Sequence, residues 1–225
     1  MANVKITGCV FDLDGTLADT APDISAALNA ALMQAGLRRL SYAEVTTMIG
    51  GGIPKLVERA IASLSAPQDL HAQLVASMLK SYTQNYCADS TLLTGVEACL
   101  AGLQARAIPM AVCTNKDQSV ARKIISAFGL DDYFVCVVGS RPDLAKKPDP
   151  TMLREAIMAI GCRPEETMMV GDSDVDAQTA SATGCVSVIV QNGYFSGDYT
   201  ALGADYLTAD MTPVLGIIDT INGRS

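Results

Sequence analysis

The stretch that decides the fold is "CVFDLDGTLADT", residues 9–20. Its first residues continue an apolar run from Ile6 that is typical of a short strand buried in a sheet. Asp12 and Asp14 follow at a spacing of two, and side chains two apart in an extended chain face the same side. Gly15 then allows the backbone to turn. The pattern predicts two neighbouring carboxylates at the end of a buried strand, although an Asp-Gly pair is also typical of a solvated loop.

Composition and charge narrow the class of protein. The chain has 225 residues, of which 49% are hydrophobic, and this indicates a globular protein with a sizeable core. The net charge is −8 and no Lys/Arg cluster occurs, which disfavours nucleic acids and membrane surfaces as partners. No apolar run reaches the length of a membrane span, and the first residues do not form a signal peptide, so we expect a cytoplasmic protein.

The cysteines and the single histidine exclude several chemistries. The seven cysteines are scattered and form no CxxC pair, which is typical of reduced packing residues. His71 is the one histidine, so a multi-histidine metal site is excluded. A Ser-His-Asp or Cys-His catalytic arrangement would have to use His71, which lies in a predicted surface helix far from any nucleophile signal.

The spacing of apolar residues along the chain changes near residue 92. Residues from about 17 to 90 show helical spacing, with Thr20 as a possible helix cap, a capping box at Ser41 and Glu44, and a break at residues 50–52. From Gly95 onward, short apolar strands alternate with helices, which indicates a parallel sheet covered on both faces. The first strand lacks partners nearby in sequence. We therefore predict an α/β fold with a doubly wound parallel sheet, formed by residues 1–16 and 92–225, and an all-helical insert at 17–91.

Polar residues gather where the predicted strands end, which is where ligands bind in parallel α/β sheets. They are Asp12, Asp14, Thr114, Asn115, Lys116, Lys146, Lys147, Asp172, Ser173, Asp174 and Asp176. Crowded carboxylates need a cation, and hard oxygen ligands without histidine indicate Mg²⁺. The set suits phosphoryl transfer, in which one aspartate attacks phosphorus and a second protonates the leaving oxygen.

Four of these motifs make the chain resemble the haloacid dehalogenase superfamily: "DLDGT" at Asp12, Thr114 with Asn115, Lys147 in "KPDP", and "GDSDVD" at residues 171–176. The resemblance implies that Asp12 is the nucleophile and Asp14 the general acid/base. It implies a Mg²⁺ site formed by Asp12, the Asp14 carbonyl and Asp172. It also implies phosphate binding by Thr114, Asn115 and Lys147, with Asp176 and Ser173 in support. Thr114 could instead cap a helix, and Lys146 with Lys147 could be a solvated pair.

The helical insert resembles the type-one cap of this superfamily. Its segment "IGGGIPKLVERA" is similar to the substrate loop of the phosphoglycolate phosphatase subfamily. The resemblance implies that Gly50, Gly51, Gly52 and Lys55 contribute to substrate specificity. A plain helix break and hinge at the glycines is the alternative, and Arg59 is a second candidate for meeting an acidic substrate.

The expected function is Mg²⁺-dependent hydrolysis of a small phosphate monoester. The resemblance favours conversion of 2-phosphoglycolate to glycolate and phosphate through an aspartyl-phosphate intermediate. A phosphosugar phosphatase or a β-phosphoglucomutase-like isomerase of the same fold stays open, and a non-catalytic binding protein is the remaining alternative. The expected partner is a small-molecule phosphate ester, and the chain is expected to be a monomer or homodimer.

Overall fold

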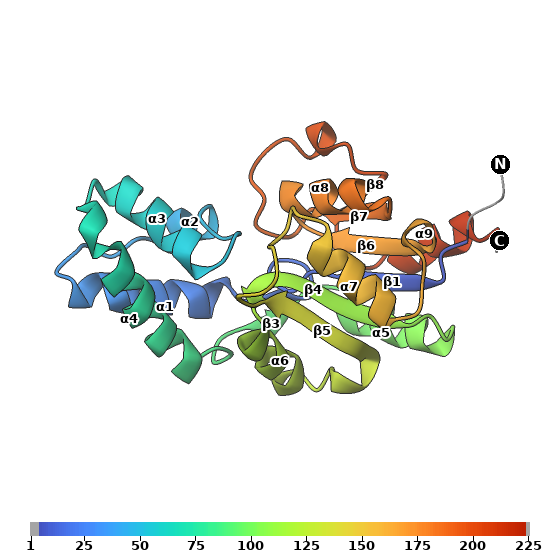
Figure 1. Ribbon diagram of the computed structural model, residues 1–225, viewed down its shortest axis with the longest axis horizontal. Helices are drawn as coiled ribbons and strands as arrows, with labels where there is room; N and C mark the ends of the chain where they lie inside the picture. Colours follow the sequence, from blue (N-terminus) through green and yellow to red (C-terminus); the bar gives the residue numbers. More distant parts are fainter. Residues whose placement is uncertain (1–4, 224–225) are drawn as a thin grey trace. The chain divides into compact units, whose positions relative to one another are not determined.

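The computed structural model describes residues 5–223, which divide into two compact units (Figure 1). The core unit comprises the chain up to Ala18 together with the part from Leu92 onward, and the helical unit comprises Asp19–Thr91. The chain passes between the units at two short strands, β2 (Ala18–Asp19) and β3 (Thr91–Leu92), which pair with each other. The insert is therefore not helical at its very ends, where we had expected only helix.

Within the described residues, the core unit contains a six-stranded sheet in the order β5-β4-β1-β6-β7-β8. The strands are β1 (Gly8–Phe11), β4 (Met110–Asp117), β5 (Phe134–Ser140), β6 (Thr167–Gly171), β7 (Val186–Val190) and β8 (Tyr206–Thr208). All of these neighbours pair in parallel. The first strand lies in the middle of the sheet, where Val10 aligns with Ala111 of β4 and with Met169 of β6. The prediction that β1 joins the later strands is confirmed.

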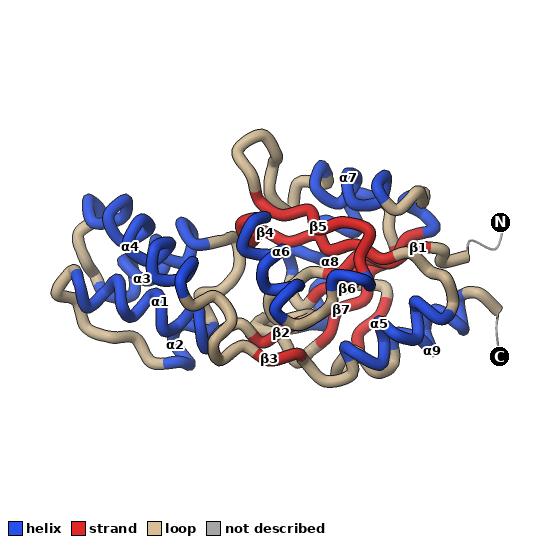
Figure 2. Tube along the Cα trace, turned by 90° about the horizontal axis from the view of Figure 1, so that it is seen from below, coloured by secondary structure: helices blue, strands red, loops and turns tan. Residues whose placement is uncertain are grey.

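Helices cover both faces of this sheet because its strands are apolar on both sides. They are α5 (Val96–Ala105), α6 (Gln118–Ala127), α7 (Thr151–Ala159), α8 (Asp174–Thr183) and α9 (Val214–Ile221). Buried residues of α7 and α8 pack with Val10, Ala111 and Met169 on one face. Figure 2 shows α5 and α9 on the other side of the sheet. Short 3₁₀ turns occur at Asp131–Tyr133, Pro164–Glu166 and Tyr199–Leu202. The predicted doubly wound α/β fold is confirmed.

The helical unit contains four α-helices in its described residues: α1 (Ala21–Gln34), α2 (Tyr42–Thr46), α3 (Ile53–Leu64) and α4 (His71–Gln84), the last preceded by a 3₁₀ turn at Gln68–Leu70. The predicted capping box is confirmed, since Glu44 N donates to Ser41 Oγ and Ser41 N donates to the Glu44 carboxylate. Thr20 is the N-cap residue of α1, as predicted, but its side chain makes no capping hydrogen bond, and Asp19 Oδ1 accepts from Ala21 N at 3.2 Å. Among the described helices, none has the length and apolar character that crossing a membrane requires.

Candidate active site

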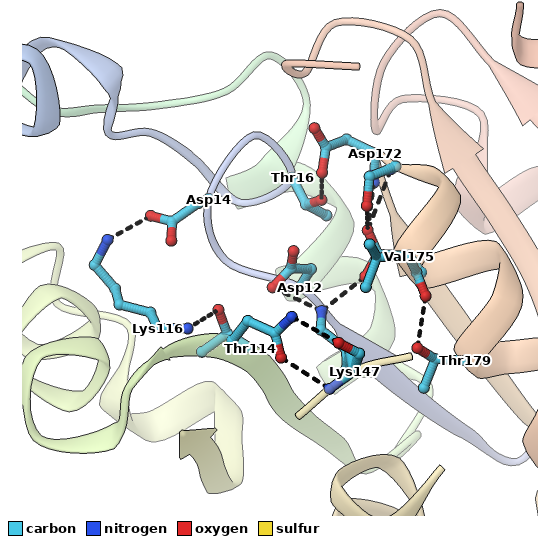
Figure 3. A network of polar contacts seen from close by, with 12 residues as sticks. Asp12, Asp14, Thr16, Thr114, Lys116, Lys147, Asp172, Val175 and Thr179 are labelled. Carbon is cyan, nitrogen blue, oxygen red and sulfur yellow. Dashed lines mark hydrogen bonds and ion pairs between the residues drawn. The ribbon is translucent and has the colours of Figure 1, made fainter. Parts of the chain in front are cut away.

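The polar residues singled out in the core unit meet at the carboxyl ends of three adjacent strands (Figure 3). Asp12 follows β1, Thr114 lies near the end of β4, and Asp172 follows β6. Since β1 pairs in parallel with both β4 and β6, their carboxyl ends share one edge of the sheet. The sheet topology thus brings together residues that lie far apart in the chain.

Lys147 is the buried cation at the centre of this site. Its Nζ lies 2.7 Å from Asp176 Oδ1 and 3.0 Å from Asp12 Oδ1. Burial alone would lower the pKa of Lys147, but the charges of Asp12 and Asp176 raise that pKa above its ordinary value. The lysine is therefore held as a cation between the two carboxylates.

Asp12 has a largely buried carboxylate, one oxygen of which accepts no hydrogen bond from the described residues. Burial raises the pKa of Asp12 to about 6, against the opposing effect of Lys147, and the charges of Asp176 and Asp14 raise it further. Asp12 Oδ1 makes its ion pair with Lys147 without hydrogen-bond geometry, and this buried oxygen accepts no hydrogen bond from the described residues. A buried carboxylate oxygen of this kind needs another electrophilic or cationic partner.

Asn115 holds the main chain of Lys147. Asn115 Nδ2 donates to Lys147 O at 3.0 Å, and Lys147 N donates to Asn115 Oδ1 at 2.9 Å. Both polar atoms of the Asn115 amide are thus committed to the backbone from which the Lys147 side chain extends. The geometry favours a positioning role for Asn115 over the direct phosphate contact that the resemblance implies.

Asp172 is held by contacts to both of its oxygens. Thr16 Oγ1 donates to Asp172 Oδ1 at 3.4 Å, and Tyr194 N donates to Asp172 Oδ2 at 2.7 Å. Burial, followed by the nearby charges of Asp176 and Asp12, raises the pKa of Asp172 well above its usual range. Gly193 is needed for this packing, because a Cβ at that position would lie 2.3 Å from Asp172 Cβ.

Asp176 joins the end of β6 to the buried lysine. Its Oδ2 accepts hydrogen bonds from Asp172 N, Ser173 N and Ser173 Oγ, at 3.3, 3.2 and 2.6 Å. Its Oδ1 pairs with Lys147, so both carboxylate oxygens are engaged. Asp174 is the first residue of α8, where a negative charge interacts favourably with the helix dipole.

Asp14 turns its carboxylate away from this cluster and toward Lys116. Lys116 Nζ donates to Asp14 Oδ1 at 2.7 Å, and the two side chains are 7% and 17% exposed. Thr114 and Lys116 both lie near the end of β4, where Thr114 Oγ1 accepts a hydrogen bond from Lys116 N at 3.3 Å. Lys116 was named among the strand-end residues, but the sequence assigned it no role.

The residues fit a divalent metal ion. One carboxylate oxygen from each of Asp12, Asp172 and Asp176 lies within 4.8 Å of the other two. These three residues form a cluster that could hold a metal ion. Three carboxylates against the single charge of Lys147 leave two uncompensated negative charges, which one Mg²⁺ would balance. The Asp12 oxygen that accepts no hydrogen bond and the all-oxygen donor set suit Mg²⁺.

The candidate specificity residues belong to the helical unit. Gly50, Gly51 and Gly52 all have positive φ angles, of 111°, 80° and 87°, which residues other than glycine rarely adopt. Lys55 is exposed and pairs with Glu58 at 2.8 Å. Arg59, the second candidate for an acidic substrate, instead donates from Nη1 to the carbonyls of Met48, Ile49 and Gly50, at 2.8, 3.3 and 3.1 Å.

Three functional contacts were missed at the sequence level: Lys116 with Asp14, Thr16 with Asp172, and Tyr194 with Asp172. Thr16 lies within the "DLDGT" motif and Lys116 directly follows Thr114 and Asn115, so a role in the site could have been assigned to both. Tyr194 contributes a backbone N–H, and its sequence signal is only the glycine before it in "QNGYF".

Comparison with known proteins agrees with this geometry. The family model described as haloacid dehalogenase-like hydrolase matches residues 9–190. A phosphoglycolate phosphatase from Cereibacter sphaeroides is 42% identical over 191 residues, covering 83% of this chain and 86% of that protein. One from Neisseria meningitidis is 38% identical over 206 residues, covering 90% and 87%. The crystal structure of a predicted phosphoglycolate phosphatase from Haemophilus somnus superposes with a TM-score of 0.88 at 29% identity, covering 96% of this chain and 99% of that one.

The chain belongs to the haloacid dehalogenase-like hydrolase family. Within that family it is a phosphoric monoester hydrolase similar to the phosphoglycolate phosphatases. The resemblance that the four motifs indicate is thereby confirmed, as is the predicted class of enzyme.

Proposed function

We propose that this enzyme hydrolyses 2-phosphoglycolate to glycolate and phosphate with Mg²⁺, through an aspartyl phosphate (an acyl phosphate) formed on Asp12. The names of its relatives support the substrate. The observation that carries the mechanism is the Asp12 oxygen that accepts no hydrogen bond, placed beside Lys147 and Asp172 at the sheet edge.

Asp12 is the nucleophile in this proposal. Its carboxylate oxygen attacks phosphorus, a bond forms between them, and the bond from phosphorus to the ester oxygen breaks. The ion pair with Lys147 orients Asp12, and the positive charge offsets the repulsion between the carboxylate and the phosphate. Thr114, buried at the end of β4, contributes its hydroxyl to phosphate binding.

Asp14 transfers the protons. Its carboxyl gives a proton to the departing ester oxygen, so glycolate leaves as an alcohol. In the second step, Asp14 takes a proton from the water that attacks the phosphorus, the bond to Asp12 breaks, and phosphate is released. The spacing of two residues places both aspartates on the same turn after β1, so one can act on phosphorus and the other on the oxygens around it.

Asp12 and Asp172 would hold Mg²⁺ through their carboxylates, together with the main-chain carbonyl of Asp14. Asp176 would act through its neighbours, since its oxygens already bind Lys147 and Ser173. The ion would supply positive charge to the phosphate oxygens and to the nucleophile. Asn115 positions Lys147, and Ser173 with Asp176 positions the end of β6.

The helical unit acts as a cap in this proposal, with Gly50–Gly52 and Lys55 as specificity residues and Arg59 as the group that shapes their loop. A closing cap would exclude water from the aspartyl phosphate until product leaves. The expectation of a cytoplasmic monomer or homodimer stays a prediction.

The experiment is a measurement of phosphate release from a panel of phosphate monoesters, with Mg²⁺ and with EDTA. We expect the highest kcat/KM for 2-phosphoglycolate, no turnover in EDTA, and a loss of roughly a thousand-fold or more in Asp12→Asn. Isomerised sugar phosphate without phosphate release would favour the mutase alternative. Near-normal turnover by Asp12→Asn would contradict the covalent mechanism.

A further inference from the structure

Lys116 is a buried cation that none of the roles above uses. Its ammonium group lies 2.7 Å from Asp14 Oδ1, and its side chain is 7% exposed. In Figure 3 the pair of Lys116 and Asp14 lies to one side of Asp12, and Asp172 lies to the other. A lysine buried to this degree needs a negative partner, and Asp14 provides one in the structure.

We propose that Lys116 determines specificity for phosphate esters that carry a carboxylate beside the ester oxygen. When such a substrate binds, Lys116 exchanges its ion pair with Asp14 for an ion pair with the substrate carboxylate. This inference rests on the proposed function, because it takes Asp14 as the group that serves the leaving oxygen.

Lys116 lies next to the side chain that must reach the ester oxygen of the substrate, that of Asp14. To serve the leaving group, the Asp14 side chain must come within hydrogen-bond distance of the ester oxygen. In 2-phosphoglycolate the carboxylate carbon is two bonds from that same oxygen. A cation already in contact with Asp14 therefore lies close to where the substrate places its second negative charge.

The charges of the site favour the same cation. A substrate carboxylate entering near Asp12 and Asp172 meets negative charge and needs a positive partner. Lys147 is shared between Asp12 and Asp176, and its position is fixed further by Asn115. Lys116 pairs with the one carboxylate whose role requires it to turn toward the substrate.

The exchange keeps Lys116 compensated throughout. Asp14 leaves the ion pair as the substrate carboxylate enters it, so the buried ammonium group is never left without a negative neighbour. An ester without the carboxylate offers no replacement for Asp14 in this ion pair. This difference predicts discrimination between the two kinds of ester by a residue that does not touch the phosphate.

The test compares 2-phosphoglycolate with ethyl phosphate, which lacks the carboxylate. We expect Lys116→Met to reduce the ratio of the two kcat/KM values by about 10- to 100-fold, the range for loss of a charge-assisted hydrogen bond. Lys116→Arg should retain most of the discrimination because it keeps the charge. Lys123→Met, on the exposed face of α6, is the matched control and should leave the ratio unchanged.

A purely structural role for Lys116 gives a different result. If Lys116 only anchors Asp14, Lys116→Met slows both esters equally and the ratio stays constant, which overturns the inference while the proposed function stands. If the wild-type enzyme does not hydrolyse 2-phosphoglycolate but does hydrolyse other esters, both the proposed substrate and this inference are wrong. Melting temperatures of each variant establish folding, and Lys116→Gln replaces Lys116→Met if the latter does not fold.

Discussion

Lys147 and Asp176 form an ion pair of 2.7 Å in which each side chain is only 1% exposed. The pair joins the loop after β5 to the first turn of α8, and so it connects two segments that both border Asp12. Buried ion pairs contribute little net stability over apolar pairs, but removing one partner leaves an uncompensated charge. Lys147 and Asp176 therefore set the geometry of the site more than the stability of the fold.

Removing the charge of Asp176 tests this relationship. We expect Asp176→Asn to lower the free energy of unfolding by about 3 kcal/mol, because the amide nitrogen would face either the Lys147 ammonium group or the donors of Ser173 in a buried position. Asp174→Asn, two residues earlier on the same helix, is the control and should change stability by about 0.5 kcal/mol or less. Urea unfolding curves measure both, and equal effects of the two variants would contradict the assignment.

Protons and Mg²⁺ compete for the same carboxylates. In the metal-free fold, burial raises the pKa of Asp12 to about 6 and the pKa of Asp172 well above its usual range. The stability that Asp12 contributes is therefore present below about pH 4 and is lost as the pH rises through about 6. We expect the melting temperature in EDTA to fall between about pH 5 and pH 7.5 on account of these groups. We expect excess Mg²⁺ to raise the melting temperature much more at the higher pH, where the Asp12 carboxyl has lost its proton.

Thermal unfolding at the two pH values, with and without Mg²⁺, measures this dependence. The exposed carboxylates with lowered pKa values, such as Glu44, titrate well below this range and do not obscure it. Asp172→Asn should flatten the metal-free dependence and reduce the effect of Mg²⁺. A Mg²⁺-induced shift of the same size at both pH values would show that these carboxylates do not bind the ion.

The close approach of Gly193 to Asp172 predicts an effect on metal affinity. A methyl group at Gly193 would lie 2.3 Å from Asp172 Cβ, so Gly193→Ala must displace the carboxylate or the backbone that donates from Tyr194. We expect the Mg²⁺ affinity, measured by calorimetry without substrate, to fall by about 10-fold or more, the range seen for loss of groups that orient metal ligands. Gly216→Ala, which meets no atom within 4 Å in helix α9, should leave the affinity unchanged.

Arg59 is expected to order the glycine loop rather than to bind substrate directly. Arg59→Ala removes the donor that holds the carbonyls of residues 48–50, so backbone amides near Gly50–Gly52 should exchange hydrogen faster. Hydrogen exchange read by mass spectrometry compares this variant with Arg39→Ala, whose side chain is exposed. Unchanged exchange in Arg59→Ala would leave Arg59 available for another role.

Several features of the protein were determined by local sequence. The alternation of short apolar runs with helical spacing predicted the parallel sheet, because side-chain periodicity depends only on neighbouring residues. Asp12 and Asp14 were placed at the end of β1, and the Ser41 capping box was predicted at α2, for the same reason. The four motifs were sufficient to identify the superfamily.

Only the tertiary structure decided which of these side chains contact one another. Lys116 and Asp14 are 102 positions apart, and the Asn115 amide reaches the Lys147 backbone across 32. Tyr194 reaches Asp172 through a main-chain N–H, which carries no side-chain signal. Such contacts depend on how β4, β1 and β6 align in the sheet and on the loops that follow them, and no local periodicity encodes that alignment. The sequence therefore determined which polar groups stand at the sheet edge, and the packing of the strands determined how they are paired.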